Sequence, residues 1–399
     1  MQSFLTDLPF ILSQSVKTAR FSGKGLTSPV FAKQCLQVIS SHWSDSLRHL
    51  SIKDRIHDVP SPVLDALALM TNLETLDLQI PQSNGVEPET LVKLGKALTR
   101  LTSLTLDLHF PLHQSPRYSV GRDDGESQHG LFPSLNDVHI YARCNDFVCQ
   151  CTPPFLADKA TSLEVILVAD IETSDFLSPL VSAFSKSKLK SVKIQNAKRD
   201  LIYPILAIAP FLRRFPLEKF EFDLGTDPAS NVDEQGVGAL LDAAFGLGHS
   251  RISIGHERED AAPNTLRHLV MWNNSLLKES NLPFLTSVAE NDIGLERLSA
   301  ELGLETLKGP EVSDLLSEWR KAPPSRSTLR YLDILYTSIG NIHGKTYVDM
   351  AKLLDLMFPQ LISIRPYDVD EDSPDWRGTW WLIEYLRLGC KERRLSSKS

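Results

Sequence analysis

The sequence lacks the features that mark several large protein classes. Its 399 residues contain no run of eighteen apolar residues, so no membrane-spanning helix is expected. Basic residues are in deficit, because 42 Lys and Arg stand against 50 Asp and Glu, a formal net charge of −8. That balance disfavours a protein held to nucleic acid by phosphate attraction. Five cysteines, an odd number, indicate reduced thiols, and residues 1–21 lack a secretory pattern, so we expect a cytoplasmic or nuclear protein.

Catalytic signatures are missing as well. No glycine-rich turn follows a predicted strand where a phosphate would bind, and no Gly-x-Ser-x-Gly motif marks a hydrolase nucleophile. The eleven histidines are scattered and show no recognisable Ser or Cys nucleophile signature. The sequence therefore predicts a protein that is not an enzyme, with no catalytic residues and no cofactor.

Two clusters have the chemistry of metal ligands without the spacing. Four soft donors occur within thirteen residues: His139, Cys144, Cys149 and Cys151. A structural zinc site usually draws on regularly spaced cysteine pairs, which these are not. Three acidic residues alternate further along: Asp368, Asp370 and Asp372. Ser373 and Thr379 occupy the places where a calcium loop needs glycine and a bidentate Glu, so neither cluster is predicted to hold a metal.

The main positive signal is an internal repeat with the pattern Leu-x-x-Leu-x-Leu, with conservative replacements. Its copies begin at Leu47, Leu73, Leu101, Leu135, Leu163, Leu189, Leu217, Leu266, Leu295, Leu329 and Leu361, with a fainter copy at Val16. Most copies are 26 to 34 residues apart, but 49 residues separate Leu217 from Leu266. That interval holds either a degenerate unit near residues 252–254 or a single insertion.

Each unit predicts a strand followed by a helix. The second and third apolar positions alternate as in a strand with one buried face. Helical spacing of apolar residues follows in several units, over residues 62–70, 89–99, 176–184, 237–245 and 348–357. Strand and helix in constant order predict parallel strands, and right-handed crossovers would wind them into a solenoid. The alternative is an ordinary doubly wound α/β domain.

The repeat resembles the leucine-rich-repeat superfamily in its long α/β form, over residues 16–367. The resemblance implies a right-handed horseshoe solenoid with parallel strands on the concave face and helices on the convex face. The family's Asn or Cys three places after the last leucine is present only as Asn274. We therefore expect the turns of this solenoid to depend more on apolar packing.

The irregular repeat lengths resemble those of fungal F-box-associated leucine-rich-repeat (RNI-like) proteins. That resemblance implies a protein-binding module that selects substrates for a ubiquitin ligase and docks a Skp-type adaptor. Leu8-Pro9 and the stretch Ile39 to Trp43 are similar in type to the two ends of an F-box. A first repeat, with a strand at 16–21 and a helix from Pro29 to Trp43, explains the same residues. The alternative function is a free-standing scaffold with no ubiquitin role.

The predicted organisation has three parts. Residues 1–45 form an N-terminal cap or degenerate F-box-like segment, residues 46–367 form the repeats with an inserted loop near 111–130, and residues 368–399 form a C-terminal capping helix and polar tail. A protein partner is expected on the concave face, where side chains between the buried leucines point outward. The predicted partner-binding residues are Tyr141, Val165, Leu167, Lys193, Trp272 and Tyr331. The inserted loop covering this face is the alternative.

Overall fold

The protein is described by a computed structural model. It covers residues 15–22, 29–53, 65–80, 88–108, 131–142, 159–167, 187–196, 215–223, 265–272, 281–290, 294–300, 302, 308–334, 344–366 and 375–396. The chain divides into two compact units, residues 1–191 and residues 192–399.

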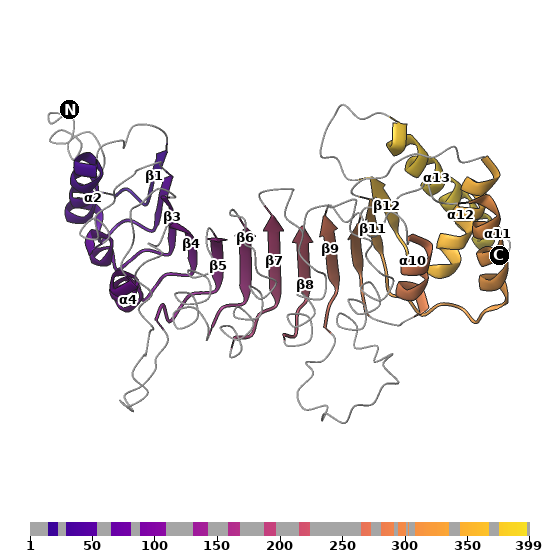
Figure 1. Cartoon of the computed structure of the whole chain (residues 1–399), viewed down its shortest axis with the longest axis horizontal. Coiled ribbons are helices and arrows are strands. Elements are labelled where there is room, and N and C mark those ends of the chain that lie inside the picture. The colour runs from indigo at the N-terminus through magenta and orange to yellow at the C-terminus, as the bar shows by residue number, and fades with distance from the viewer. Residues whose placement is uncertain are drawn as a thin grey trace, which may run out of the picture. The chain divides into compact units, whose positions relative to one another are not determined.

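Among the described residues, twelve parallel strands form one sheet whose strand order follows the chain from β1 to β12 (Figure 1). The strands are β1 (Thr18–Ser22), β2 (His49–Lys53), β3 (Thr75–Ile80), β4 (Ser103–Leu108), β5 (Asp137–Ala142), β6 (Ser162–Leu167), β7 (Ser191–Asn196), β8 (Lys219–Asp223), β9 (His268–Trp272), β10 (Arg297–Ala300), β11 (Tyr331–Ile334) and β12 (Ser363–Pro366). With the helices between them, this confirms the predicted fold class, an α/β leucine-rich-repeat solenoid.

The described helices belong to the two ends of the chain. They are α2 (Pro29–Trp43), the 3-10 turn η2 (Ala66–Leu69), α4 (Pro88–Ala97), α10 (Asn281–Glu290), α11 (Gly309–Lys321), α12 (Gly344–Met357) and α13 (Asp375–Ser396). The helices predicted around 89–99 and 348–357 are confirmed, whereas the segment 62–70 has only the short turn η2 in its described part. The predicted helices at 176–184 and 237–245 lie outside the described residues. In the part of the chain that the structure covers, no helix is long and apolar enough to cross a membrane.

Three apolar positions per unit build the core. The first-position side chains, from Leu47 to Leu361, are at most 3 % exposed. The second and third positions pair with their counterparts on neighbouring strands, as Leu50 does with Leu76 and Ile52 with Leu78. Each of the three repeat positions therefore forms a continuous apolar row across neighbouring strands, and burying those rows favours folding.

The predicted repeat at β6 was wrong, because the observed repeat starts three residues earlier and the buried and outward faces of the strand are exchanged. We expected Leu163, Ile166 and Val168 in the core and Val165 outside. Instead Val165 is fully buried and pairs with Ile140 of β5. The unit begins at Ala160, which is also fully buried, and alanine was not recognised as a first position. Ile166, being apolar, made the shifted alternation look equally good.

The described strands on either side of the long interval between Leu217 and Leu266 are neighbours in the sheet. β8 pairs directly with β9, with Phe220 opposite Leu269 and Phe222 opposite Met271. A degenerate unit near residues 252–254 would have required a strand between these two. The single insertion is therefore the correct alternative.

A backbone hydrogen-bond pattern recurs where the strands begin, and we call it the strand-start ladder. The carbonyl of the residue before a strand accepts two N–H groups, from the residue before the next strand and from that strand's first residue. The Arg48 carbonyl, for example, accepts from Glu74 and Thr75 at 2.8 and 3.0 Å. Within the described residues, the ladder carbonyls are those of Lys17, Arg48, Glu74, Thr102, Asn136, Thr161, Glu218, Arg267, Glu296 and Arg330. The family's asparagine would stand three places after the last leucine of each repeat, and these positions, Asn274 included, lie outside the described residues.

The first repeat begins at β1. Its residues Ala19 and Phe21 pair with Leu50 and Ile52 of β2, and α2 follows with Leu36 and Ile39 buried. The stretch Ile39 to Trp43 thus belongs to a strand-and-helix unit, which supports the first-repeat interpretation of residues 16–43.

A buried arginine closes the last repeat. Arg387 of α13 is fully buried and makes a two-fold contact with Glu384, from Nε to Oε2 at 2.7 Å and from Nη2 to Oε1 at 2.9 Å. Its Nη2 also donates to the carbonyl of Ile362 at 3.1 Å, and Nη1 donates to the carbonyl of Leu361 at 3.0 Å. Ile362 precedes β12, so its carbonyl holds the ladder position that would otherwise accept from a following strand. The arginine therefore supplies the donors that a next repeat would have supplied.

The helix that carries this arginine is longer than predicted. A capping helix over 376–388 followed by a solvated tail was expected, and α13 instead continues to Ser396. Trp380 and Ile383 are buried as the capping role requires. Lys391, in the predicted tail, reaches the Leu361 carbonyl at 3.5 Å.

Replacing Arg387 by Met should destabilise the protein by about 3–5 kcal/mol, because the buried Glu384 carboxylate would lose its counterion and the Ile362 carbonyl its donor. Chemical denaturation monitored by circular dichroism measures the change. Arg320→Met, on the exposed surface of α11, is the matched control and should stay within about 0.5 kcal/mol of wild type. Equal stability of the two variants would contradict the capping role.

The register of β6 is tested by a pair of neighbouring substitutions. Val165→Ala should cost about 2 kcal/mol because it removes buried methyl groups from a packed core. Ile166→Ala, at a half-buried position on the other face, should cost less than about 1 kcal/mol. The reverse order of unfolding free energies would restore the shifted register.

Candidate functional site: the open face of the sheet

The face of the sheet opposite the core carries side chains that are mostly polar and half-buried. We call it the open face; its residues alternate with the buried core positions along each strand. Because the strands are parallel and in register, equivalent open-face residues form rows across each unit. In the N-terminal unit one such row runs Ser51, Asp77, Thr105 and His139 on β2 to β5 and ends at Glu164 on β6.

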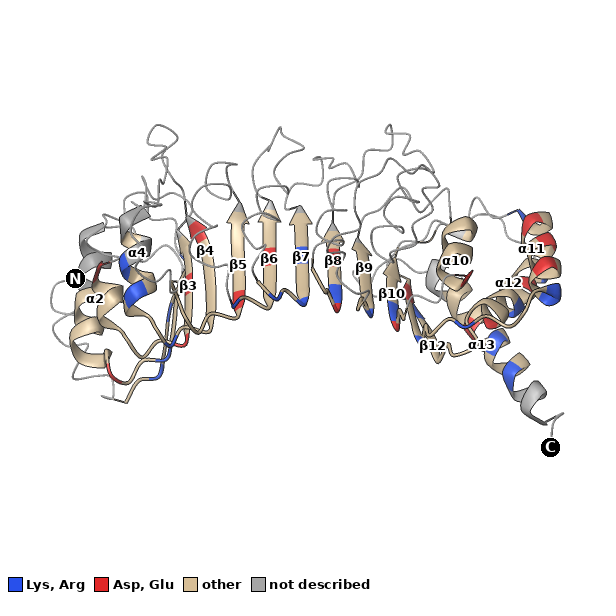
Figure 2. Cartoon of the chain, turned by 90° about the horizontal axis from the view of Figure 1, so that it is seen from below, with Lys and Arg blue, Asp and Glu red and all other residues tan. Residues whose placement is uncertain are grey.

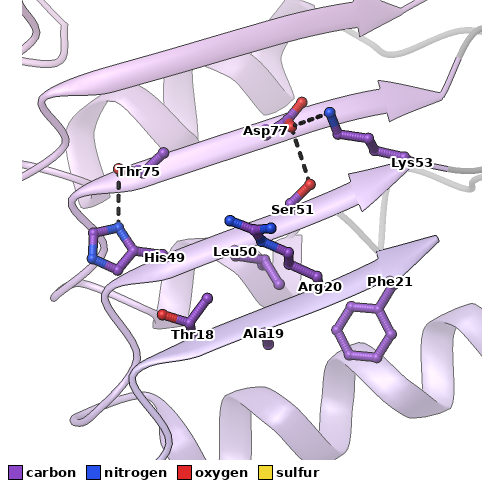
Figure 3. A pocket seen from close by; sticks show the side chains of 10 residues that line it. All are labelled: Thr18, Ala19, Arg20, Phe21, His49, Leu50, Ser51, Lys53, Thr75 and Asp77. Atoms are coloured by element: carbon purple, nitrogen blue, oxygen red, sulfur yellow. Dashed lines mark hydrogen bonds and ion pairs between the residues drawn. The ribbon is translucent and has the colours of Figure 1, made fainter.

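A groove of about 680 Å³ lies over the first three strands of the N-terminal unit. Figure 3 shows its lining, with Arg20 reaching from β1 toward β2 and His49, Ser51 and Lys53 facing β3. His49 Nδ1 lies 3.1 Å from the Thr75 hydroxyl. Arg20 is exposed and makes no ion pair or hydrogen bond to another described side chain. The groove therefore offers one available guanidinium beside hydroxyl and imidazole groups.

Asp77 organises the polar side chains of that groove. Its Oδ2 accepts a hydrogen bond from the Ser51 hydroxyl at 3.0 Å and pairs with Lys53 Nζ at 3.1 Å. Its Oδ1 accepts from Gln79 Nε2 at 3.0 Å. Three donors on one carboxylate hold neighbouring strands' side chains in fixed positions, so this part of the open face is pre-organised.

Further along the N-terminal unit, the open face is acidic and includes a tyrosine. His139 Nδ1 lies 2.5 Å from Glu164 Oε2 across β5 and β6. Burial raises the pKa of Tyr141 above its ordinary value of 10.0; nearby Lys53 lowers it, and the carboxylates of Asp107 and Glu164 raise it. Tyr141 is therefore a neutral phenol at physiological pH. The cysteines grouped with His139 in the sequence, and the aspartates at 368–372, lie outside the described residues.

The C-terminal unit has a different charge balance on its open face. Glu221 pairs with two lysines, Lys193 at 3.5 Å and Lys219 at 3.1 Å. Asp333 accepts from Arg297 Nε at 2.7 Å and from the Ser299 hydroxyl at 2.9 Å, and its side chain is 6 % exposed. Each described carboxylate of this face is thus matched by at least one cation.

Tyr331 lies between two arginines of neighbouring strands. The guanidinium of Arg297, on β10, is 5.6 Å from the centre of the ring, and that of Arg365, on β12, is 5.7 Å from it. At these distances a guanidinium over the ring is attracted to the negative face of the aromatic system.

His268 lies next to this group, opposite Arg297 and Lys219 in the strand register. Burial lowers the pKa of His268 below its ordinary value of 6.5, and Arg297 lowers it further. Glu296 raises it, while Lys219 and Arg267 lower it. His268 is therefore uncharged at neutral pH.

The predicted partner residues fall into three groups. Tyr141, Lys193 and Tyr331 lie half-buried on the open face, as the alternation predicted. Val165 lies in the core, so its predicted outward orientation was wrong. The backbone of β6 places Leu167 opposite Ala142, and that of β9 places Trp272 opposite Asp223, but the side chains of both residues are outside the described part of the chain.

Sequence reasoning missed the residues that act through a partner on another strand. Asp77, Glu164, Arg297 and Arg365 become notable only when the register sets them beside Lys53, His139 and Tyr331. The one available signal was a pair of opposite charges at nearby, non-equivalent positions of consecutive repeats, such as Arg297 and Asp333.

No protein-family model matches the sequence, and no curated protein sequence matches it. Solved structures that are similar to this chain include two of comparable length. One is a chain of the crystal structure of the Rad7 and Elc1 complex in yeast, with 13% identity, coverage of 94% of this chain and 82% of that chain, and a TM-score of 0.40. Another is a leucine-rich-repeat protein of Leptospira interrogans, with 13% identity, coverage of 88% of this chain and 90% of that chain, and a TM-score of 0.31. The architecture of this chain rests on its own strands and helices.

The charge around His268 gives a testable titration. We expect His268 to remain neutral at pH 7, and Arg297→Gln to raise its pKa, because Arg297 is the largest charge effect after burial. A pH titration of the histidine ring signals by NMR measures the protonation of His268 in the wild type and its pKa change in Arg297→Gln. The loss of a signal in His268→Gln assigns the resonance. Arg330→Gln removes the same charge at a residue outside the open face and should leave the titration of His268 unchanged.

The same shift has a consequence for stability. The pKa of His268 is lower in the folded protein than in the unfolded chain, so the unfolded chain binds a proton at this histidine first as the pH falls. Protonation of His268 therefore lowers the free energy of unfolding as the pH falls through 6.5. His268→Gln should lose that part of the pH dependence. An unchanged profile in the variant would mean that His268 is not shifted in the folded protein.

Proposed function

We propose that this protein is a non-catalytic, protein-binding leucine-rich-repeat module whose docking surface is the open face. The observation that carries the proposal is the pair of half-buried tyrosines, Tyr141 and Tyr331, held among fixed charged side chains on parallel strands. Tyrosines and arginines are enriched at the energetic centres of protein interfaces. Side chains on a rigid sheet also lose little freedom on binding, which favours affinity.

The more specific proposal is a substrate receptor for ubiquitination. It comes from the resemblance of the repeat lengths to fungal F-box-associated proteins, and it requires a Skp-type adaptor. The adaptor would dock away from the open face, leaving that face for the substrate.

The alternative is a free-standing interaction scaffold with no ubiquitin-ligase role. One observation favours it: residues 18–22 and 29–43 form the strand β1 and the helix α2 of a repeat, with β1 paired to β2 over its whole length. Those residues include the stretch that resembled the end of an F-box. Adaptor binding therefore decides between the two proposals.

Docking on the open face predicts a specific loss of captured protein. Tyr331→Ala and Tyr141→Ala should each reduce recovery of the partner at least about tenfold, because each removes an aromatic contact from the interface. Tyr385→Ala makes the same change at a 76 % exposed position on α13 and should not reduce recovery. Affinity purification with quantitative mass spectrometry, beside a thermal melt of each variant, makes the measurement.

Equal recovery by folded wild type and both open-face variants would rule out this docking surface. Purification of the full chain with a co-expressed Skp-type adaptor tests the ubiquitin role separately. A stable complex supports the substrate receptor, whereas loss of partner in the tyrosine variants without any adaptor binding supports the scaffold.

A further inference from the structure

Among the described side chains on the open face of the C-terminal unit, basic groups outnumber acidic ones, although the whole chain has a net charge of −8. Its described basic side chains are Lys193, Lys219, Arg297 and Arg365, and its described acidic side chains are Glu221 and Asp333. The carboxylates are nearly buried, at 10 % and 6 % exposure, whereas the Lys219 and Arg297 side chains are 45 % and 40 % exposed. Solvent and any ligand therefore meet the cations first.

Arg297 and Arg365 have donors left to offer. Arg297 uses Nε for Asp333, and its only other described contact is with the Tyr331 ring. Arg365 is exposed and makes no ion pair or hydrogen bond with another described residue, and its described contact is with the Tyr331 ring. Since a guanidinium carries five N–H donors, most donors of this arginine–tyrosine cluster (Arg297, Tyr331 and Arg365) are available to a ligand.

The neighbouring strand adds to the positive potential. His268 stands beside Arg297 in the register, and the charges of Arg297, Lys219 and Arg267 lower its pKa, whereas Glu296, which pairs with Arg267, raises it. Arg297 and Lys219 thus both act on one point of the open face, and the described carboxylates Glu221, Asp333 and Glu296 are each already paired with a cation. An anionic ligand meets attraction here and no uncompensated described carboxylate.

We propose that the arginine–tyrosine cluster binds an acidic segment of the protein partner, with Asp or Glu carboxylates seated on Arg297 and Arg365 across the Tyr331 ring. This inference rests on the proposed function and names the chemistry of the partner. Guanidinium groups bind carboxylates through paired hydrogen bonds, which suits side chains of an acidic peptide. The ring keeps two like charges close together and orients their free edges.

The probe is a fluorescein-labelled hexaglutamate peptide, and its binding to the full chain is followed by fluorescence anisotropy at about 50 mM NaCl, where screening is modest. Arg365→Gln should weaken binding about tenfold or more, since it removes charge-assisted hydrogen bonds. Arg330→Gln removes the same charge from an exposed residue just before β11 and should change the affinity by less than about twofold. A hexaglutamine peptide should bind at least about tenfold more weakly than hexaglutamate.

Arg365 is the primary substitution because its side chain has no described carboxylate partner that the change would leave unpaired. Arg297→Gln removes a donor from the nearly buried Asp333 and can lower stability, so a thermal melt accompanies it. Tyr331→Ala is the third variant and should also weaken hexaglutamate binding, because the guanidiniums lose their support.

Unchanged hexaglutamate affinity in Arg365→Gln and Tyr331→Ala would overturn the inference, as would an equal loss in Arg330→Gln. Sedimentation velocity checks a second copy of the chain as the occupant; a dimer that Arg365→Gln converts to monomer would also overturn it. If hexaglutamate fails while Tyr331→Ala still loses its captured partner, only the acidic-segment inference fails. If neither open-face tyrosine affects capture, the proposed function itself fails.

Discussion

The rest of this structure depends on the hydrogen bonds accepted by the backbone carbonyl just before each strand. It accepts two N–H groups from the next unit, at distances of 2.8–3.3 Å wherever the described residues show it. Two donors on one acceptor define where the next strand begins and in which register it runs. The apolar rows of the core and the polar rows of the open face follow from that register, because equivalent positions of successive units then lie side by side.

The strand-start ladder is made by backbone atoms alone. Because this residue also donates its N–H to the preceding carbonyl, any residue type except proline can occupy the position before a strand, and Lys, Arg, Glu, Thr and Asn all occur there. Charged residues at the strand starts, visible in Figure 2, can then pair across units, as Arg267 and Glu296 do at 2.6 Å. Only the strand start and three apolar positions need to repeat, so the chain tolerates intervals as different as 26 and 49 residues.

The open face shows how one scaffold can present two kinds of surface. In the N-terminal unit, carboxylates gather donors from neighbouring strands, as Asp77 does from Ser51 and Lys53. In the C-terminal unit, nearly buried carboxylates leave the cations more exposed. The end of the solenoid is closed by the same chemistry, since Arg387 replaces the missing donors at Ile362 while Glu384 neutralises its charge. A partner that selects between the units can therefore do so by charge.

The sequence alone predicted the solenoid, its strands and most of its core, because the alternating apolar positions of each repeat favour one buried face. It determined the outward placement of Tyr141 and Tyr331 for the same reason. It failed at Val165, because Ala160 hid the start of the unit and a one-residue slip exchanges the two faces of a strand. The choice between insertion and hidden unit after Leu217 needed the pairing of β8 with β9. Only the tertiary structure decided the ladder, the cap and the arginine–tyrosine cluster, since backbone acceptors leave no mark on residue type and Arg297, Tyr331 and Arg365 meet only through strand register.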